Sequence, residues 1–450
     1  MAYSSEFRIS LVDRIATFAR GILILLALAA LPARVDLDIS VTQGTISTQP
    51  IAIVPFAEPA GAPTDVAQVI ENDLVYSGLF RTISRNLMLE KPTDPAQVDY
   101  RNWRTVGMNN IVIGQLRAEG VGYSARFFIL DVYGKNPPVG FEVQAVQPKD
   151  LRHLAHQISD IIYKQLTGTP GYFNTRLAYV TVTGNIDQVT KRQWQLTLAD
   201  SDGEDPVRVA FPPPGQPLMS PSWSPDGKQL AFVAYDNRGR SSIYVYTVAS
   251  GEHREYHYET AVNIAPAWSP DGRYLAASLS FDGNENIYII DLATGSKRRL
   301  TTNAGIDTSP TWSPDGQWIA FNSDRGGSPQ IYRVSAQGGQ PQRLTFQGRQ
   351  NLKPVFSPDG KKIALVNMDA NSDLRIALFD LQSQQMKFLT DGPVDDSPSF
   401  APSGNILMYE RIGAGGGVAL ATVSTDGLIK RDVRILNTQV QSPAWSTYLQ

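Results

Sequence analysis

One eight-residue motif recurs along the second half of this chain, and it constrains the fold more than any other feature. A representative copy reads Ser-Pro-Thr-Trp-Ser-Pro-Asp-Gly, and its aromatic residue returns every 44 or 45 residues. The copies span residues 220–227, 265–272, 309–316, 353–360, 397–404 and, in truncated form, 442–446. A repeat of this length indicates an array of similar supersecondary units, each of which needs its neighbours to bury its apolar face.

Each repeat has the pattern of one small antiparallel sheet. In Ser-Pro-Asp-Gly, proline presets φ, the aspartate side chain can bond the turn backbone and glycine permits a positive φ, so a tight turn is predicted. Alternating apolar residues follow the turn, as in 230–232 and 319–321. An Ile-Tyr pair comes next, as in 331–332, and the repeat ends on Arg-Leu-Thr, as in 343–345. Four strands in about 44 residues are typical of a β-propeller blade.

The two ends of the repeat region complement each other. The last repeat supplies only a first strand, residues 442–446, whereas 177–179, 194–196 and 207–209 have the pattern of second, third and fourth strands with no first strand before them. We therefore predict a six-bladed β-propeller whose first blade is closed by the C-terminal strand, which protects edge backbone groups from pairing with other chains.

The residues before the ring predict a compact α/β domain. Continuous apolar runs at 51–56 and 111–114 are typical of buried strands, and alternating runs at 122–131 and 139–147 predict a hairpin. Apolar residues at helical spacing predict helices over 64–77 and 149–166, the second of which is stopped by Gly168 and Pro170. The predicted organisation is a secretory signal peptide at 1–33, a mobile tail or strand at 34–48, the α/β domain at 49–170 and the propeller at 171–450.

The N-terminus has the pattern of an export signal. Three arginines precede an apolar run from Gly21 to Leu31, which is followed by Pro32-Ala33. Eleven apolar residues are too few to span a bilayer of about 30 Å but suit a secretory signal peptide, so cleavage is expected near Ala33. We therefore expect an exported mature chain that stays in the periplasm if the cell has two membranes.

Composition excludes several functional classes. Lys plus Arg number 40 and Asp plus Glu 43, and this near-balance argues against a protein that binds nucleic acid through a basic patch. Hydrophobic residues make up 42% and charged residues 18%, which excludes a disordered chain. The 36 glycines and 30 prolines fit a fold with many turns. Because there is no cysteine, disulfides, thiolate nucleophiles and Cys-ligated zinc are excluded.

The sequence offers no candidate catalytic residues. The Gly-x-Ser-x-Gly motif of α/β hydrolases is absent, and Gly413 to Gly417 does not match the dinucleotide-binding pattern. The repeated aspartates are explained by turn chemistry, and all four histidines are interpreted as surface or capping residues. We therefore expect no catalytic site, no cofactor and no metal site. The repeated aspartates are Asp226, Asp271, Asp315 and Asp359, and the four histidines are His153, His156, His253 and His257.

A candidate binding surface precedes each Pro-x-aromatic motif. These short segments connect the outer strand of one blade to the inner strand of the next, so they are expected to rim one mouth of the central tunnel. Their mixture of apolar, acidic and amide side chains suits a protein partner, with a standard interface of about 1,600 Å². Ordinary solvated loops are the alternative, and the residues alone leave both open. The segments are 218–219, 263–265, 307–309, 351–352, 395–396 and 440–441.

Several motifs resemble the TolB family, the periplasmic components of the Tol-Pal systems of Gram-negative envelopes. The resemblance covers the whole mature chain. It rests on Val-Thr-Gln-Gly at 41–44, Ile-Ala-Ile-Val-Pro-Phe at 51–56, Asp-Leu-Val-Tyr-Ser-Gly-Leu-Phe at 73–80, Leu-Ala-His-Gln-Ile-Ser-Asp at 154–160, Leu-Thr-Gly at 166–168 and the propeller turns.

The resemblance implies a non-enzymatic adaptor with two partners. In the family, the propeller mouth binds Pal, the peptidoglycan-associated lipoprotein, and the mature N-terminal segment engages the inner-membrane protein TolA, which supports outer-membrane integrity and invagination during division. Pal binding orders the N-terminal tail, and its release frees the tail for TolA. We expect a monomer within a multiprotein envelope complex that binds no nucleic acid.

The partner-binding residues implied for this chain form two sets. At the rim, Met219, Val262, Ala265, Thr308 and Ser309 occupy family positions for Pal, and the other rim candidates are Asn263, Asp307, Asn351, Leu352 and Asp396. Val262 stands where histidine is common in the family, and Ser309 stands where an acid is common. Residues 34–45 correspond to the TolA-binding tail, with Arg34, Val35, Asp36, Leu37, Asp38, Ile39, Ser40 and Val41 as candidates.

Two other functional classes stay open. A secreted six-bladed propeller could be an enzyme, either a lactonase with a calcium ion held in the tunnel or a propeller associated with a peptidase. A module that binds carbohydrate or peptidoglycan would be expected to expose stacked aromatic residues, which the rim segments lack.

Overall fold

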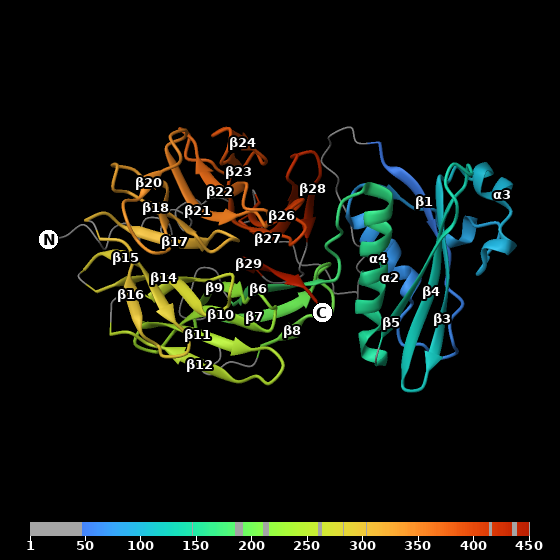
Figure 1. Cartoon of the computed structure of the whole chain (residues 1–450), viewed down its shortest axis with the longest axis horizontal. Coiled ribbons are helices and arrows are strands. Elements are labelled where there is room, and N and C mark those ends of the chain that lie inside the picture. Colours follow the sequence, from blue (N-terminus) through green and yellow to red (C-terminus); the bar gives the residue numbers. More distant parts are fainter. Residues whose placement is uncertain are drawn as a thin grey trace, which may run out of the picture.

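The protein is described by a computed structural model with an α/β domain at one end and a β-propeller at the other (Figure 1). The structure describes residues 47–145, 147–184, 192–209, 216–259, 263–281, 283–302, 304–413, 416–433 and 439–449. The proposed signal peptide, residues 34–46 of the tail and Val262 therefore lie outside the described residues.

A five-stranded sheet forms the centre of the α/β domain. Its strand order is β2-β1-β3-β4-β5, in which β1 runs parallel to β2 and β3, and β4 is antiparallel to β3 and β5. Both predicted buried strands and the predicted hairpin are confirmed. The strands are β1 (Gln49–Ile53), β2 (Phe80–Arg81), β3 (Asn110–Glu119), β4 (Gly122–Asp131) and β5 (Val139–Ala145).

Helices cover both faces of this sheet. The predicted long helices are α2 (Val66–Tyr76), capped by the Asp65 side chain, and α4 (Leu151–Thr167), which ends at Gly168 with a φ of 76°. They pack against each other between the sheet and the propeller (Figure 1). The opposite face packs on Trp103 of α3 (Tyr100–Thr105). Three 3₁₀ turns complete the domain: η1 (Arg85–Leu87), η2 (Pro95–Gln97) and η3 (Pro148–Asp150).

Six four-stranded antiparallel sheets form the propeller, as the repeats predict. The first strands are β9 (Leu218–Trp223), β13 (Asn263–Trp268), β17 (Asp307–Trp312), β21 (Gln350–Phe356), β25 (Asp395–Phe400) and β29 (Gln439–Tyr448). The second strands are β10 (Gln229–Tyr235), β14 (Tyr274–Ser280), β18 (Trp318–Ser323), β22 (Lys362–Met368), β26 (Ile406–Ile412) and β6 (Thr175–Thr183). The third strands are β11 (Ser241–Thr247), β15 (Glu285–Asp291), β19 (Gln330–Ser335), β23 (Leu374–Asp380), β27 (Val418–Ser424) and β7 (Gln193–Asp200). The fourth strands are β12 (His253–Tyr256), β16 (Lys297–Arg299), β20 (Gln342–Arg343), β24 (Met386–Phe388), β28 (Lys430–Val433) and β8 (Val207–Arg208).

The C-terminal strand closes the ring. Strand β29 pairs with β6, which places Trp445 opposite Leu177, and the Trp445 indole donates to Thr175 Oγ1 at 2.8 Å. Each first strand contacts the first strand of the next blade, and β29 contacts both β25 and β9. The predicted closure is therefore confirmed.

The repeated turns have the predicted chemistry. In the first copy, Ser224 Oγ donates to Asp226 Oδ1 at 2.6 Å, the same carboxylate accepts from the Lys228 amide, and Gly227 has a φ of 69°. In the third copy, the hydrogen bond from Ser313 lowers the pKa of the Asp315 carboxyl. The aspartates therefore act within their own turns.

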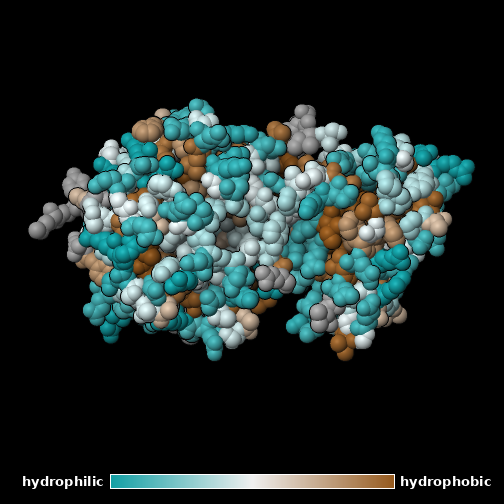
Figure 2. Space-filling view, in the orientation of Figure 1, coloured by the Kyte–Doolittle hydropathy of each residue, from teal (hydrophilic) through white to brown (hydrophobic). Residues whose placement is uncertain are grey.

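The two domains share one apolar core. A single cluster joins Ile70 and Ile158 of helices α2 and α4 to Leu177 and Trp445 of the first blade. Phe141 is half-buried and packs against this cluster. Figure 2 shows apolar side chains gathered on the α/β domain beside the propeller. Such a continuous core favours a fixed domain arrangement.

Gly78 marks a close approach between the domains and provides a stability test. It has a φ of 78°, and an added Cβ would lie 2.8 Å from Ile429 Cγ2 and 3.0 Å from Arg431 Nη2 of the propeller. Gly78→Ala is expected to lower the free energy of unfolding by about 2–4 kcal/mol, because backbone strain adds to overpacking. Urea unfolding measures this effect.

Gly107→Ala is the matched control for that substitution. Gly107 has a φ of 74°, but an added Cβ would meet nothing within 4 Å. The control should lose only about 1–2 kcal/mol, from backbone strain alone. Equal losses in the two variants would contradict a tight contact between the domains at Gly78.

Candidate functional site

The two ends of the propeller ring are not equivalent. Contacts with the α/β domain come from the end at which the first strands finish, including Trp445 and the turn that contains Ala401. At the same end, Tyr448 donates to the Gly171 carbonyl and Tyr172 packs edge-on against Trp445. Because the first strands all run in the same direction, their starting ends form the opposite end of the ring. We call that opposite end the mouth.

A backbone irregularity recurs in every first strand at the mouth. The residue before each motif proline has a φ between 48° and 54°, although none of the six is glycine. A residue before proline normally avoids such conformations, and the strand pairing slips at this point, as in a β-bulge. In a regular strand, side chains alternate between the two faces of the sheet. The bulge interrupts this alternation, so two consecutive side chains are half-buried at the mouth. The six residues are Ser220, Ala265, Ser309, Lys353, Ser397 and Ser442.

Three rim residues identified from the sequence are buried. Asn263 donates to the Ser241 carbonyl at 2.9 Å, and Asn351 bonds Gln330, Gln347 and Asn367. Asp307 is fully buried and accepts two 2.8 Å hydrogen bonds from Arg325. These side chains hold neighbouring strands together and are not available to a partner at the surface. The described rim residues lie near the start of the inner strands, and not in the connecting loops that the sequence suggested.

The other described rim residues are half-buried at the mouth. They belong to five of the six first strands, so the mouth brings together side chains that are far apart in the sequence. Thr308 accepts a hydrogen bond from the Asn322 side chain, and Leu352 packs at the edge of an apolar cluster. The residues are Met219, Ala265, Thr308, Ser309, Leu352 and Asp396.

Two charged residues at the mouth, Lys353 and Glu410, were missed by the sequence analysis, which had named only their neighbour Asp396. Lys353 Nζ donates to Asp396 Oδ2 at 2.8 Å and to Ser397 Oγ at 2.9 Å. The Glu410 side chain accepts a hydrogen bond from the Ser442 amide. Burial raises the pKa of Glu410, and the charge of Lys353 opposes this shift. The available signal was that Lys353 is the one charged residue among the six that precede the motif prolines.

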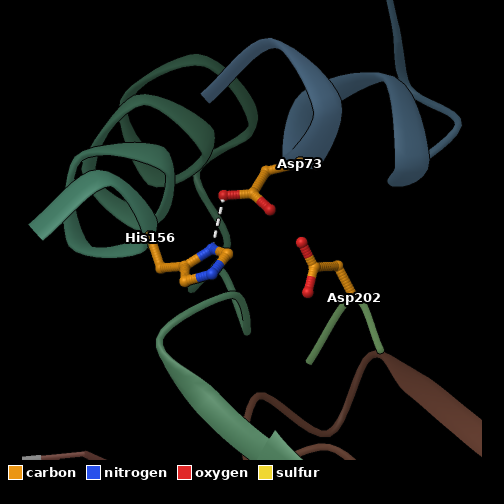
Figure 3. Close-up of side chains that lie close together, drawn as sticks. All are labelled: Asp73, His156 and Asp202. Atoms are coloured by element: carbon orange, nitrogen blue, oxygen red, sulfur yellow. Dashed lines mark hydrogen bonds and ion pairs between the residues drawn. The ribbon is translucent and has the colours of Figure 1, made fainter. Parts of the chain in front are cut away.

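The junction between the domains holds a second polar cluster (Figure 3). His156 of α4 is fully buried, and its Nδ1 lies 2.8 Å from Asp73 Oδ2 of α2. Its Nε2 lies 3.5 Å from Asp200 Oδ2 at the end of β7. Asp202 lies in the following turn and accepts a 2.7 Å hydrogen bond from Arg152. The prediction of a surface or capping role was therefore wrong for His156, because burial of this helix face depends on docking of the propeller.

Charge interactions dominate the junction. Burial by itself would lower the pKa of His156, but the Asp73 charge and hydrogen bonds with Asp200 and Asp73 raise it to about 10. Burial would raise the pKa of Asp200, but its bonds with His156 and Arg152 lower it to about 2. His153 is half-buried, whereas His253 and His257 are exposed, and the His257 ring bonds Ser242 Oγ.

These features define a six-bladed propeller protein with an α/β domain docked on one end of its ring. A family model described as the TolB beta propeller domain matches residues 163–449, and one described as the TolB amino-terminal domain matches residues 37–138. The chain belongs to the TolB family.

Relatives in both sequence and structure agree with this assignment. A "Tol-Pal system protein TolB" from Methylococcus capsulatus is 51% identical over 435 residues, covering 97% of this chain and 100% of the relative. Another from Thioalkalivibrio sulfidiphilus is 49% identical and covers 96% and 98%. The crystal structure of TolB from Acinetobacter baumannii aligns with a TM-score of 0.81 and 34% identity over 91% of this chain and 99% of that one.

Proposed function

We propose that this protein is a non-enzymatic adaptor of the periplasm that binds the lipoprotein Pal at the propeller mouth and TolA through its N-terminal tail. In this role it supports outer-membrane integrity and invagination during division. Membership of the TolB family supports the proposal, since its curated relatives are named Tol-Pal system proteins. None of the described helices is both long and apolar enough to cross a membrane.

The observation that carries the Pal assignment is the paired exposure of side chains at the mouth. Each bulge leaves two neighbouring residues half-exposed, so the six first strands offer a ring of adjacent polar and apolar groups. A partner that covers this ring can contact five or six blades at once. Calorimetric titration with the soluble domain of Pal tests the proposal, and the expected result is a one-to-one complex. Absence of binding would contradict it.

The TolA assignment concerns the tail, residues 34–48. Under this proposal, residues 1–33 are removed on export and the tail becomes the new N-terminus. Removing residues 34–45 is expected to abolish TolA binding while Pal binding is kept, because the residues proposed to contact Pal belong to the propeller mouth and not to the tail. Titration of the shortened protein with each partner measures both effects. Retained TolA binding would contradict the tail assignment.

The enzymatic alternative makes a different prediction about calcium. A calcium-dependent lactonase holds its ion with side chains that converge in the tunnel, and calcium prefers oxygen ligands. Among the described residues, the group of His, Asp and Glu side chains close enough to share an ion lies at the domain junction. If the protein is a non-enzymatic adaptor, we expect no calcium to copurify with it. A stoichiometric calcium ion would favour the lactonase class.

A further inference from the structure

The junction cluster, defined as Asp73, His156 and Asp202, has the composition of a metal site. One ligand atom from each residue lies within 4.8 Å of the others. An imidazole with two carboxylates suits a borderline transition-metal ion better than calcium. We propose that this cluster binds one divalent ion of the Zn²⁺ or Mn²⁺ type between the two domains. The proposal departs from our expectation from the sequence that the chain has no metal site.

An unpartnered buried oxygen provides independent support for a ligand. Asp73 is 1% exposed, and its Oδ1 accepts no hydrogen bond. The nearby Ser159 hydroxyl, which opposes the rise that burial causes in the pKa of Asp73, donates instead to the Ala155 carbonyl at 3.0 Å. Leaving a buried carboxylate oxygen unpaired is unfavourable. Figure 3 shows the Asp73 carboxylate directed into the space between His156 and Asp202. An ion in that space would satisfy Oδ1.

The surroundings of His156 fit the orientation that a metal ligand needs. With Nδ1 directed toward Asp73, the opposite ring atom Nε2 faces Asp200 Oδ2 at 3.5 Å. A ligating histidine commonly donates its other N–H to a carboxylate, which fixes the ring and its tautomer. On metal binding, the present hydrogen bond between Nδ1 and Asp73 Oδ2 would be replaced by bonds from both atoms to the ion, while the Asp200 carboxylate stays at ion-pair distance from Nε2.

Charge balance also favours a divalent cation. Asp73, Asp200 and Asp202 bring three carboxylates together, and Arg152 supplies one guanidinium, which contacts Asp200 at 2.9 Å and Asp202 at 2.7 Å. Asp205 also lies 3.4 Å from Arg152, so with His156 neutral the carboxylates outnumber the guanidinium, and a divalent ion would offset much of this negative charge. Without the ion, a proton on the imidazole provides part of this compensation.

The position of the site gives the ion a structural role. Asp73 and His156 come from the α/β domain, whereas Asp202 comes from the first blade of the propeller. An ion bound by all three therefore links the domains directly. Because such a ligand binds the docked arrangement and not the unfolded chain, it should raise the melting temperature.

Zinc uptake by the untagged mature chain tests the proposal. After treatment with a chelator, the protein is dialysed against ZnCl₂ at pH 8, and bound zinc is measured by atomic emission. We expect one equivalent of zinc and an increase in melting temperature. Calcium under the same conditions should give neither, because it seldom takes imidazole ligands. Uptake of calcium in place of zinc, or no saturable zinc uptake, would overturn the proposal.

Two variants of the same turn separate this site from adventitious binding. Asp202→Asn should lower zinc affinity at least about tenfold and abolish the zinc-dependent increase in melting temperature. Asp205→Asn is the matched control, because the Asp205 side chain is 71% exposed and lies 3.4 Å from the same Arg152. Its φ of 50° suits asparagine. Comparing each variant with and without zinc removes any effect on apo stability. If Asp202→Asn and the wild type bound zinc with equal affinity, the ion would be bound at another site and the proposal would be wrong.

Discussion

An arginine at position 308 should abolish Pal binding while leaving the fold intact. Thr308 is half-buried at the mouth, where β17 neighbours β13 and β21 in the ring. A long, charged side chain there would obstruct a docked partner and place a cation in the interface. We expect the Kd to rise at least about 100-fold, comparable to the loss of a central interface residue. Calorimetric titration with Pal measures the change.

The fold should tolerate Thr308→Arg because the side chain is at the surface. The hydrogen bond that its Oγ1 accepts from Asn322 contributes about 1 kcal/mol. Gln317→Arg is a matched control, since it adds the same charge at an exposed position in the same blade, at the opposite end of β17. The control should bind Pal as the wild type does. Undiminished affinity in Thr308→Arg would reject the mouth as the Pal site.

Deleting residues 442–450 should have the largest effect on stability. This truncation removes most of β29 and exposes the edge of β6. It also removes Trp445 from the shared core and the Ala444 carbonyl that accepts from the Trp223 indole at 3.1 Å. Losing one large core side chain costs roughly 2–5 kcal/mol, and domains have about 5–15 kcal/mol in total. We expect a melting temperature lower by more than about 10 °C, or a chain that does not fold.

A shorter truncation tests whether the loss of stability comes from opening the ring or from removing any residues at the C-terminus. Removing Leu449 and Gln450 leaves β29 intact and loses two hydrogen bonds, one from the Leu449 amide to the Asn174 carbonyl at 3.1 Å and one from the Asn174 side chain to the Leu449 carbonyl at 3.2 Å. Its melting temperature should remain within a few degrees of the wild type. Thermal unfolding followed by circular dichroism compares the two truncations. An unchanged melt after deletion of 442–450 would contradict closure by β29.

The architecture was predictable because it depends on local patterns. Ser-Pro-Asp-Gly specifies its turn through the chemistry of four neighbouring residues. The number of regularly spaced copies of that turn predicted the number of blades. The incomplete repeat at 442–446 and the three unmatched strands before 210 indicated how the ring closes. The bulge in each first strand could not be predicted, because a positive φ at the residue before proline runs against the local preference of that residue.

The site was less predictable because burial depends on residues far apart in the chain. The polarity of Asn263, Asp307 and Asn351 suggested an accessible surface, but their partners on neighbouring strands bury them. His156 looks like an ordinary helical residue in the sequence, whereas Asp73 and Asp200 approach it only after the domains dock. The local sequence around each of these residues gives no indication of the contacts that it makes with residues far away in the chain.

Closure of the first blade by β29 also fixes an order of events during synthesis. Strands β6, β7 and β8 are made before any other part of the propeller, but the strand that completes their sheet follows every other blade in the chain. The edge of β6 therefore stays unpaired while five further sheets are made. Proteins in which distant segments must pair fold slowly and expose such edges for longer. The ring can close only after residues 439–448 have been delivered, so any factor that protects this chain from aggregation must act until then.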